Sequence, residues 1–236
     1  MMLRNKAFVL STALLLLLSN SVAMALPSSM TAVYNVYRGS MSVGNLVSSL
    51  KYQGTQYQYH KSTQATGLAK LLTGARVVEN SDGTFAGDKL TPTAYLYDEK
   101  TRSKSRMERT RFAGNRATGV YKDKSYTVTT PPNVLDRASL ELAVARDLQN
   151  GVAQLSYQVF ERGEVKNYSF VRLGSERLKT NAGTFNTVKV KVKRTDTSRE
   201  TIYWMAVEMG YLPAKMTHRE DDELITSQVA QYKAIP

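Results

Sequence analysis

The sequence has 236 residues and no cysteine, with 32 Lys and Arg against 20 Asp and Glu, which gives a formal net charge of +12. The lack of cysteine excludes disulfide bonds, thiol chemistry and lipid attachment through a cysteine, so stability has to come from a hydrophobic core. The positive charge favours anionic neighbours such as lipid headgroups or acidic glycans, although scattered Lys and Arg also serve solubility alone.

The first 25 residues have the three regions of a secretory leader. Arg4 and Lys6 supply the positive start, residues 7–18 form an apolar run, and Ala23-Met24-Ala25 supplies small residues for cleavage. The apolar run is shorter than the ~20 residues that a membrane-spanning helix needs. We therefore predict a cleavable signal peptide over 1–25, followed by one antiparallel β domain over 26–236 that has no transmembrane segment. The protein is expected in the periplasm, where nucleic acid is not an expected partner, and it is not expected to be a lipoprotein.

Beyond the leader, apolar and polar residues alternate with a period of two. In the clearest run, Thr187 to Arg194, Val188, Val190 and Val192 fall on one face and three lysines fall on the other. This pattern is typical of a half-buried strand. Further β-rich runs cover residues 32–38, 42–52, 56–59, 75–79, 93–97, 125–130, 153–160, 164–173, 199–207, 214–219 and 224–232.

Turn signals separate these runs, among them Arg38-Gly39, Ser81-Asp82-Gly83, Gly114-Asn115, Arg162-Gly163 and Asp221-Asp222. Many strands at this spacing favour an antiparallel sheet over alternating β and α units. We predict a mainly β fold, in which a curved antiparallel sheet (an open or half barrel) carries one or two short helices packed on it.

One clear helix is predicted from Asp136 to Gln149. Pro131-Pro132 ends the preceding strand, Asp136 is a good N-cap, and Asn150-Gly151 follows the last helical residue. An apolar stripe at helical spacing consists of Leu140, Ala143, Val144 and Leu148. This stripe is expected to lie on the sheet.

A shorter helical turn, predicted over residues 67–72, carries Leu68, Leu71 and Leu72. If the sheet curls around a cavity, these leucines plug it or form a movable lid over an apolar ligand. Alternatively, they complete the core. The sequence leaves both interpretations open.

The stretch from Lys100 to Arg116 is rich in cations and contains one acid, Glu108. On a strand, one face would carry Arg102, Lys104 and Arg106, and the other would carry Arg109 and Arg111. Because both faces cannot be core, we expect an exposed hairpin arm or an edge strand with a bulge. The cations either keep sheet edges from pairing or form an anion-binding ridge for phosphates or headgroups.

The sequence contains no recognisable motif for catalysis or for cofactor binding. His60 and His218 have no second histidine at metal-ligand spacing, so neither a metal nor a cofactor is predicted. Nucleophile-elbow, Walker and dinucleotide-binding glycine motifs are absent. The acidic run at residues 220–223 is expected to be a solvated turn. We predict a protein that is not an enzyme, with a pair of carboxylates as the remaining route to hydrolysis.

Several short stretches, in order along the chain, together form a pattern: Tyr34-x-x-Tyr37, Val43-Gly44, Thr66-Gly67-Leu68, Leu90-Thr91-Pro92, Leu135-Asp136-Arg137-Ala138-Ser139, Gly174-Ser175-Glu176-Arg177-Leu178-Lys179-Thr180, Ala182-Gly183-Thr184-Phe185, Trp204-Met205-Ala206 and Tyr211-Leu212-Pro213. This pattern resembles the domain of unknown function 3108 family, exported β-rich proteins of Gram-negative bacteria. The family has no assigned catalytic residues. Its architecture is similar to that of the periplasmic lipoprotein carriers LolA and LolB, which implies a hydrophobic-ligand or lipoprotein-binding role by analogy of fold alone.

Our hypothesis from the sequence is a non-enzymatic binding or chaperone-like protein of the cell envelope that holds a lipid or other apolar ligand in its curved sheet. The alternative is a protein–protein interaction module of envelope assembly with a solid core. A hydrolase that acts on envelope polymers is the third hypothesis.

Overall fold

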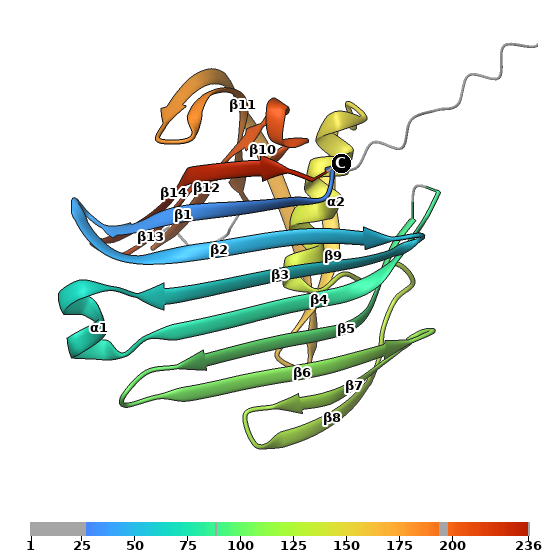
Figure 1. The fold of residues 1–236 in the computed structure, drawn as a ribbon. Helices are drawn as coiled ribbons and strands as arrows, with labels where there is room; N and C mark the ends of the chain where they lie inside the picture. Colours follow the sequence, from blue (N-terminus) through green and yellow to red (C-terminus); the bar gives the residue numbers. More distant parts are fainter. Residues whose placement is uncertain (1–26, 88, 194–197, 236) are drawn as a thin grey trace, which may run out of the picture.

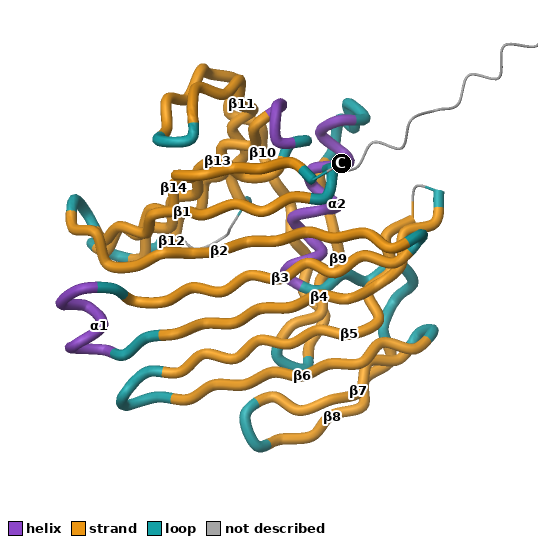
Figure 2. The backbone as a smooth tube through the Cα atoms, viewed as in Figure 1, coloured by secondary structure: helices purple, strands orange, loops and turns teal. Residues whose placement is uncertain are grey.

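The described part of the chain forms fourteen β-strands, two α-helices and one short 3-10 helix (Figures 1 and 2). The computed structural model describes residues 27–87, 89–193 and 198–235, so the predicted signal peptide lies outside the described residues. None of the helices in these ranges is long and apolar enough to cross a bilayer.

The strands of the first half are Met30–Arg38 (β1), Met41–Gln53 (β2), Gln56–Ala65 (β3), Arg76–Ala86 (β4), Lys89–Lys100 (β5), Ser105–Ala113 (β6), Arg116–Tyr121 (β7) and Lys124–Thr129 (β8). Those of the second half are Leu155–Glu161 (β9), Glu164–Thr180 (β10), Gly183–Val192 (β11), Arg199–Ala206 (β12), Leu212–Glu220 (β13) and Glu223–Ala234 (β14). The helices are Gly67–Thr73 (α1), Arg137–Gln149 (α2) and the 3-10 turn Val207–Met209 (η1).

All fourteen strands belong to one sheet, in the order β8-β7-β6-β5-β4-β3-β2-β1-β14-β13-β12-β11-β10-β9. Every neighbouring pair is antiparallel. The first and last strands pair in the middle of the sheet, and the outer strands β8 and β9 do not pair with each other. The sheet is therefore curved and open (Figure 1), which confirms the predicted fold class.

Side chains bring the two ends of this sheet together without joining their backbones. The ring centroid of Phe160 in β9 lies 5.8 Å from that of Phe112 in β6 and 5.4 Å from that of Tyr126 in β8. The backbone N–H of Arg162 donates to Oε1 of Glu108 at 2.6 Å. Aromatic contacts at these distances are favourable, so they hold the sheet curled although it has no closing ladder.

Helix α2 lies inside the curl of the sheet (Figure 1). It contacts β4, β5, β9 and β13, and the predicted stripe is buried in the main core. Leu142 is also fully buried, at 0% exposure. The predicted helix, its N-cap and its apolar face are all confirmed. The 67–72 helical turn is likewise found, as α1.

The N-terminus of α2 is fixed by a buried polar network. Asp136 and Ser139 form a capping box, in which the Ser139 N–H donates to the Asp136 carboxylate at 2.8 Å and the Asp136 N–H donates to Ser139 Oγ at 2.9 Å. Ser81 of β4 donates to the same carboxylate at 2.6 Å. Asp136 is fully buried, and its burial raises its pKa to about 7, against an ordinary value of 3.8.

The turn predicted at Ser81-Asp82-Gly83 is wrong, because these residues lie inside β4. The glycine there serves close packing instead of a reversal of the chain. A Cβ on Gly83 would lie 2.4 Å from the Thr91 carbonyl oxygen and 2.6 Å from the Tyr57 ring. Glycine inside a strand often marks such a close approach, and the β4–β5 register also shifts at this point.

The exposed arm or bulged edge strand predicted for the basic stretch is also wrong. β6 pairs with β5 on one side and with β7 on the other, without a register shift. Two of its inward polar groups have partners, since Glu108 accepts from the Arg162 N–H and Thr110 Oγ1 lies 2.6 Å from the Tyr126 hydroxyl. Arg109 and Arg111 are exposed on the outer face. An interior strand therefore carries two of its charges on the solvent side, while Glu108 is buried.

Replacing Asp136 by Asn is expected to change how stability depends on pH. Between roughly pH 4 and pH 7 the folded carboxyl keeps a proton that the unfolded one has lost, so stability falls as pH rises through this window, by up to about 1.4 kcal/mol per pH unit. The Asn side chain still accepts the Ser139 N–H but does not ionise. In urea unfolding at pH values of about 5 and 8, Asp136→Asn should gain stability relative to the parent at the higher pH. A difference that stays constant with pH would contradict this expectation.

Candidate functional site

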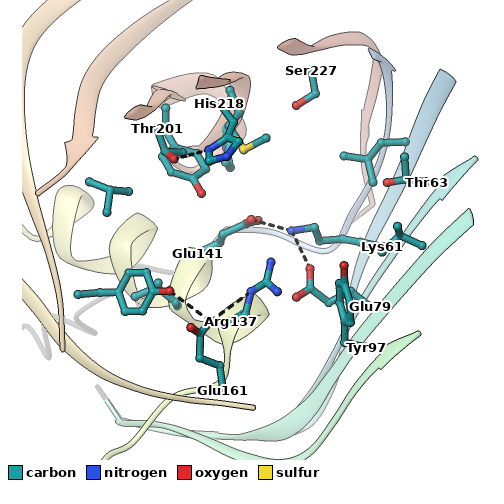
Figure 3. Close-up of a pocket in the computed structure, with 18 of the residues that line it drawn as sticks. Lys61, Thr63, Glu79, Tyr97, Arg137, Glu141, Glu161, Thr201, His218 and Ser227 are labelled. Atoms are coloured by element: carbon teal, nitrogen blue, oxygen red, sulfur yellow. Dashed lines mark hydrogen bonds and ion pairs between the residues drawn. The ribbon is translucent and has the colours of Figure 1, made fainter. Parts of the chain in front are cut away.

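A hollow of about 960 Å³ opens on the concave side of the sheet, beside α2 (Figure 3). Side chains from both halves of the sheet and from α2 line it. The volume is in the range of about 300–1,000 Å³ that is usual for small-molecule sites. The curl of the sheet therefore encloses more space than α2 and the core fill.

Among the described residues that line the hollow, cations outnumber acids. The cations are Lys61, Arg106, Arg137, Arg162, Lys166, Lys193 and Arg199, and the acids are Glu79, Glu141, Glu161 and Glu220. Aliphatic and aromatic side chains lie among them, including Leu46, Tyr59, Val77, Leu140, Tyr203 and Met216. The interior that the sequence led us to expect as apolar is therefore an amphipathic hollow with a positive balance of charge.

The period of two along β3 explains how a lysine comes to face the interior. Tyr57, Tyr59, Lys61 and Thr63 occupy alternate positions, so they share the concave face. The two tyrosines are buried in the main core, and Lys61 and Thr63 line the hollow. On the neighbouring strand, Glu79 faces inward by the same alternation. The sheet thus changes along its length from a packed core to a polar chamber.

Lys61 lies between two carboxylates at the centre of the hollow (Figure 3). Its Nζ is 2.6 Å from Glu141 Oε1 on α2 and 3.4 Å from Glu79 Oε2 on β4. The Tyr59 hydroxyl donates to Glu141 at 2.9 Å, and the Tyr95 hydroxyl donates to Glu79 at 2.6 Å. Each member of this network is therefore held in place by two partners or by a neighbouring tyrosine.

The electrostatics of this network keep it ionised. Burial lowers the pKa of Lys61, but the carboxylates of Glu141 and Glu79 outweigh burial and leave that pKa well above its ordinary value. Burial likewise raises the pKa of Glu79, and the nearby charges of Lys61 and Arg137 outweigh it and lower the pKa. Lys61 and Glu79 are thus fixed charges near neutral pH.

A second charged group surrounds Glu161 near the end of β9. Arg137, the first residue of α2, places Nε 3.8 Å from Glu161 Oε2 and stacks over Tyr97 at 5.2 Å from the ring centroid. Lys166 lies 2.9 Å from Glu161 Oε1. Burial raises the pKa of Glu161, but the hydrogen bond from Lys166 and the charge of Arg137 outweigh it and lower the pKa.

Thr201 and His218 face the hollow from β12 and β13 (Figure 3). Thr201 Oγ1 lies 2.8 Å from His218 Nδ1, and His218 Nε2 lies 3.8 Å from Glu220 Oε2. A hydroxyl, an imidazole and a carboxylate in this order are also found in hydrolase triads. Here, however, Thr201 is 5% exposed and is the direct cross-strand partner of His218, so a substrate has little access to its hydroxyl.

This arrangement suits electrostatic binding better than proton transfer. A general acid has to stay protonated near neutral pH, whereas neighbouring cations hold Glu79 and Glu161 ionised. Within the described ranges, no three His, Cys, Asp or Glu side chains are grouped so that they would hold a metal ion. The acidic turn predicted at residues 220–223 is a solvent-exposed hairpin turn between β13 and β14.

The three leucines singled out in the sequence lie away from this hollow. Leu68, Leu71 and Leu72 are 63%, 65% and 68% exposed, and α1 has no buried residue. They therefore do not complete the core, and they are not among the residues that line the hollow. Their use as a movable lid over a ligand stays a prediction.

The five cations of the predicted ridge do not share one surface. Arg102 and Lys104 lie in the turn between β5 and β6, Arg109 and Arg111 point outward, and Arg106 lines the hollow. Lys104 and Arg106 both approach Glu99, at 3.8 Å and 2.9 Å. Anion binding by these residues stays a prediction. Of the five, Arg106 alone lines the hollow.

The sequence analysis missed Lys61, Glu79, Arg137 and Glu141. Two local signals pointed to three of these residues. Lys61 continues the alternation that starts at Tyr57, so it is a charge at an inward position. Arg137 and Glu141 are one helical turn apart, on either side of Leu140 in the apolar stripe. A charge at an inward position of a strand or helix is a sign of an internal polar site.

A family model described as "Protein of unknown function (DUF3108)" matches residues 33–223. The chain belongs to the DUF3108 family. The resemblance seen in the short motifs is thereby confirmed, while the search among curated proteins found no match.

Two solved structures resemble this DUF3108 protein. The crystal structure of a beta-barrel-like protein of domain of unknown function DUF1849 from Brucella abortus superposes with a TM-score of 0.59 at 9% identity, covering 89% of this chain and 99% of that one. A "putative lipoprotein" from Parabacteroides distasonis ATCC 8503 gives a TM-score of 0.36 at 8% identity, with coverage of 89% and 98%, which is too low to support an argument. The first likeness concerns the fold alone, and neither comparison indicates a catalytic activity.

Removing the central cation of the DUF3108 hollow should destabilise the fold. Lys61→Met leaves Glu79 and Glu141 without their shared partner, and we expect a loss of about 3 kcal/mol in the free energy of unfolding at neutral pH. The loss should be smaller at a pH of about 4, because Glu79, whose pKa Lys61 lowers in the parent, takes up a proton more readily without that charge. Urea unfolding at the two pH values measures both effects.

Two further variants serve as controls for this expectation. Lys51→Met, at an exposed position of β2, should change stability by less than about 0.5 kcal/mol. Adding Glu79→Gln and Glu141→Gln to Lys61→Met removes the unpaired charges and should restore part of the loss. If Lys61→Met proved as harmless as Lys51→Met, the network would have no structural role.

Proposed function

We propose that this DUF3108 protein is a non-enzymatic binding protein of the cell envelope, and that it holds an anionic amphiphile in the hollow. The observation that carries the proposal is the open space of about 960 Å³ lined by seven cations and four acids among the described residues, with aliphatic and aromatic side chains between them. A packed interaction module has no use for such a space, so the hollow favours binding of a ligand over a solid core.

The negative charge of the ligand is inferred from the donors that face the hollow. The Nε of Arg106 is buried and has no hydrogen-bond partner among the described residues, although its guanidinium also pairs with Glu99. Buried donors are rarely left unsatisfied in native proteins. Because this atom has almost no exposed surface, the Arg106 side chain has to shift toward the hollow before a phosphate or carboxylate oxygen of a ligand can accept a charge-assisted hydrogen bond from it.

The apolar part of the ligand is inferred from the rest of the wall. Leu46, Val77, Leu140 and Met216 offer aliphatic surface within the same hollow. A wholly apolar ligand would displace water from the fixed charges of Lys61 and Glu141 without replacing their hydration, which is unfavourable. We therefore narrow the lipid or apolar ligand expected from the sequence to a molecule with an anionic group and an apolar part.

The envelope location in this proposal depends on the leader predicted over residues 1–25. An exported protein of this kind meets anionic amphiphiles among phospholipids, fatty acids and acylated sugars. Hydrolysis of such molecules is the weaker alternative, because Glu79 and Glu161 are held as carboxylates and Thr201 is buried.

Calorimetric titration with three probes tests the proposal. Dodecyl phosphate should bind, whereas dodecyl maltoside, a neutral amphiphile, and inorganic phosphate, which lacks a chain, should each bind at least about tenfold more weakly. Native mass spectrometry of the protein from its own envelope should show an added mass that is an anionic amphiphile. Equal affinity for the neutral and anionic amphiphiles, or no binding of any probe, would contradict the proposal.

A pair of substitutions locates the binding in the hollow. Arg106→Met, which removes the unpaired Nε, should weaken dodecyl phosphate binding about tenfold, the value of one charge-assisted hydrogen bond. Arg109→Met removes the same charge from the outer face of the same strand and should leave the affinity unchanged. An equal effect of the two variants would mean that the anion binds outside the hollow.

A further inference from the structure

Two features that lie apart in the sequence meet at one end of the sheet. Helix α1 projects beyond the ends of β3 and β4, and the β5–β6 turn lies beside it (Figure 1). The backbone N–H of Arg102 in that turn donates to the carbonyl of Thr73, the last residue of α1, at 2.9 Å. The Arg102 side chain lies next to Gly74, which ends the helix in a left-handed conformation. The leucines and part of the basic stretch therefore form one surface.

The apolar part of this surface is unusually exposed. Leu68, Leu71 and Leu72 are each about two-thirds exposed, and no residue of α1 is buried. Their spacing of three and four residues places them on the same side of the helix. Met41, in the adjoining strand β2, is 63% exposed as well. Clusters of exposed large apolar side chains mark interaction surfaces in water-soluble proteins.

The charged part of the surface is positive on its outside. Lys70, Lys100, Arg102 and Lys104 are all exposed. The acids beneath them are mostly covered, since the side chains of Asp98 and Glu99 are 17% and 18% exposed and each is within 4 Å of two cations. The acidic β13–β14 turn lies beside the β1–β2 turn, where Glu223 pairs with Arg38 at 3.1 Å. Strands β1 and β2 separate it from β3 in the sheet order.

We propose that this surface, which we call the leucine end (α1 and the β5–β6 turn), docks on an anionic lipid bilayer. Leucines that project from the short helix α1 reach the boundary between headgroups and acyl chains, while the lysine and arginine side chains next to them contact lipid phosphates. A protein partner fits less well, because protein interfaces are depleted in Lys and their hot spots are rarely Leu. The proposal concerns where the protein sits, and it does not require a ligand in the hollow.

Co-sedimentation with lipid vesicles tests the leucine end. The protein should bind vesicles of phosphatidylcholine mixed with phosphatidylglycerol, and bind vesicles of phosphatidylcholine alone much more weakly. The triple variant Leu68→Ser, Leu71→Ser, Leu72→Ser should reduce binding to the anionic vesicles at least about tenfold. Arg102→Glu with Lys104→Glu should do the same, and added salt should weaken the parent's binding.

Matched control variants show whether vesicle binding depends on the leucine end itself or only on net charge and on exposed apolar side chains elsewhere. Arg109→Glu with Arg111→Glu makes the same change of net charge on the outer face of β6, and Val171→Ser with Leu173→Ser removes exposed apolar side chains from β10. Both pairs should bind anionic vesicles as the parent does. All the altered side chains are exposed, so thermal unfolding should stay near that of the parent.

Three outcomes would overturn the proposal: unchanged vesicle binding by the leucine variant, equal weakening by the Arg109 and Arg111 pair, or equal binding of neutral and anionic vesicles. Dodecyl phosphate titration of the leucine variant keeps the two proposals apart, because its affinity in the hollow should not change. Loss of vesicle binding with retained dodecyl phosphate binding therefore supports membrane docking by the leucine end, independently of ligand binding in the hollow.

Discussion

The architecture depends on one helix held inside a sheet that does not close. The apolar side of α2 completes the core, and the buried cap at Asp136 ties its first turn to Ser81 on β4. Because α2 fills only part of the concavity, the rest of the space stays open beside it. Arg137 and Glu141 project from the helix into that space, so the element that builds the core also supplies part of the polar wall.

In the proposed function, the charges in the hollow serve binding more than stability. A buried ion pair gains little over well-packed apolar residues, because desolvation of both ions offsets their attraction. The protein nevertheless places Lys61 between Glu79 and Glu141 and supports both acids with tyrosine hydroxyls. Charges that are already fixed by protein partners do not need to reorganise when a polar ligand arrives, which favours selective binding.

The hollow and the leucine end are built from different side chains and bind by different physical interactions. The hollow is lined by charges that the protein itself neutralises in part, whereas the leucine end exposes apolar side chains and cations to solvent. If both proposals hold, the protein binds an amphiphile inside the sheet and meets a membrane with the end of the sheet that carries α1.

The sequence by itself determined the structural features that depend on residues close together in the chain. The period of two predicted most strands, and the cap and stripe predicted α2 with its buried face, because strand alternation and helix capping are local patterns. Local patterns failed at Ser81-Asp82-Gly83, where a glycine serves packing against Tyr57, and at β6, where two neighbouring strands cover a charged segment.

Tertiary structure alone decided the site. Lys61 and Glu141 are 80 residues apart in the chain, and only the docking of α2 inside the curl brings them within 2.6 Å. In the same way, the Arg102 turn meets α1 because β4 and β5 run side by side and return the chain to the same end of the sheet. The pattern of residues settles which faces are buried, but the contacts between distant segments settle whether the enclosed space is core or chamber.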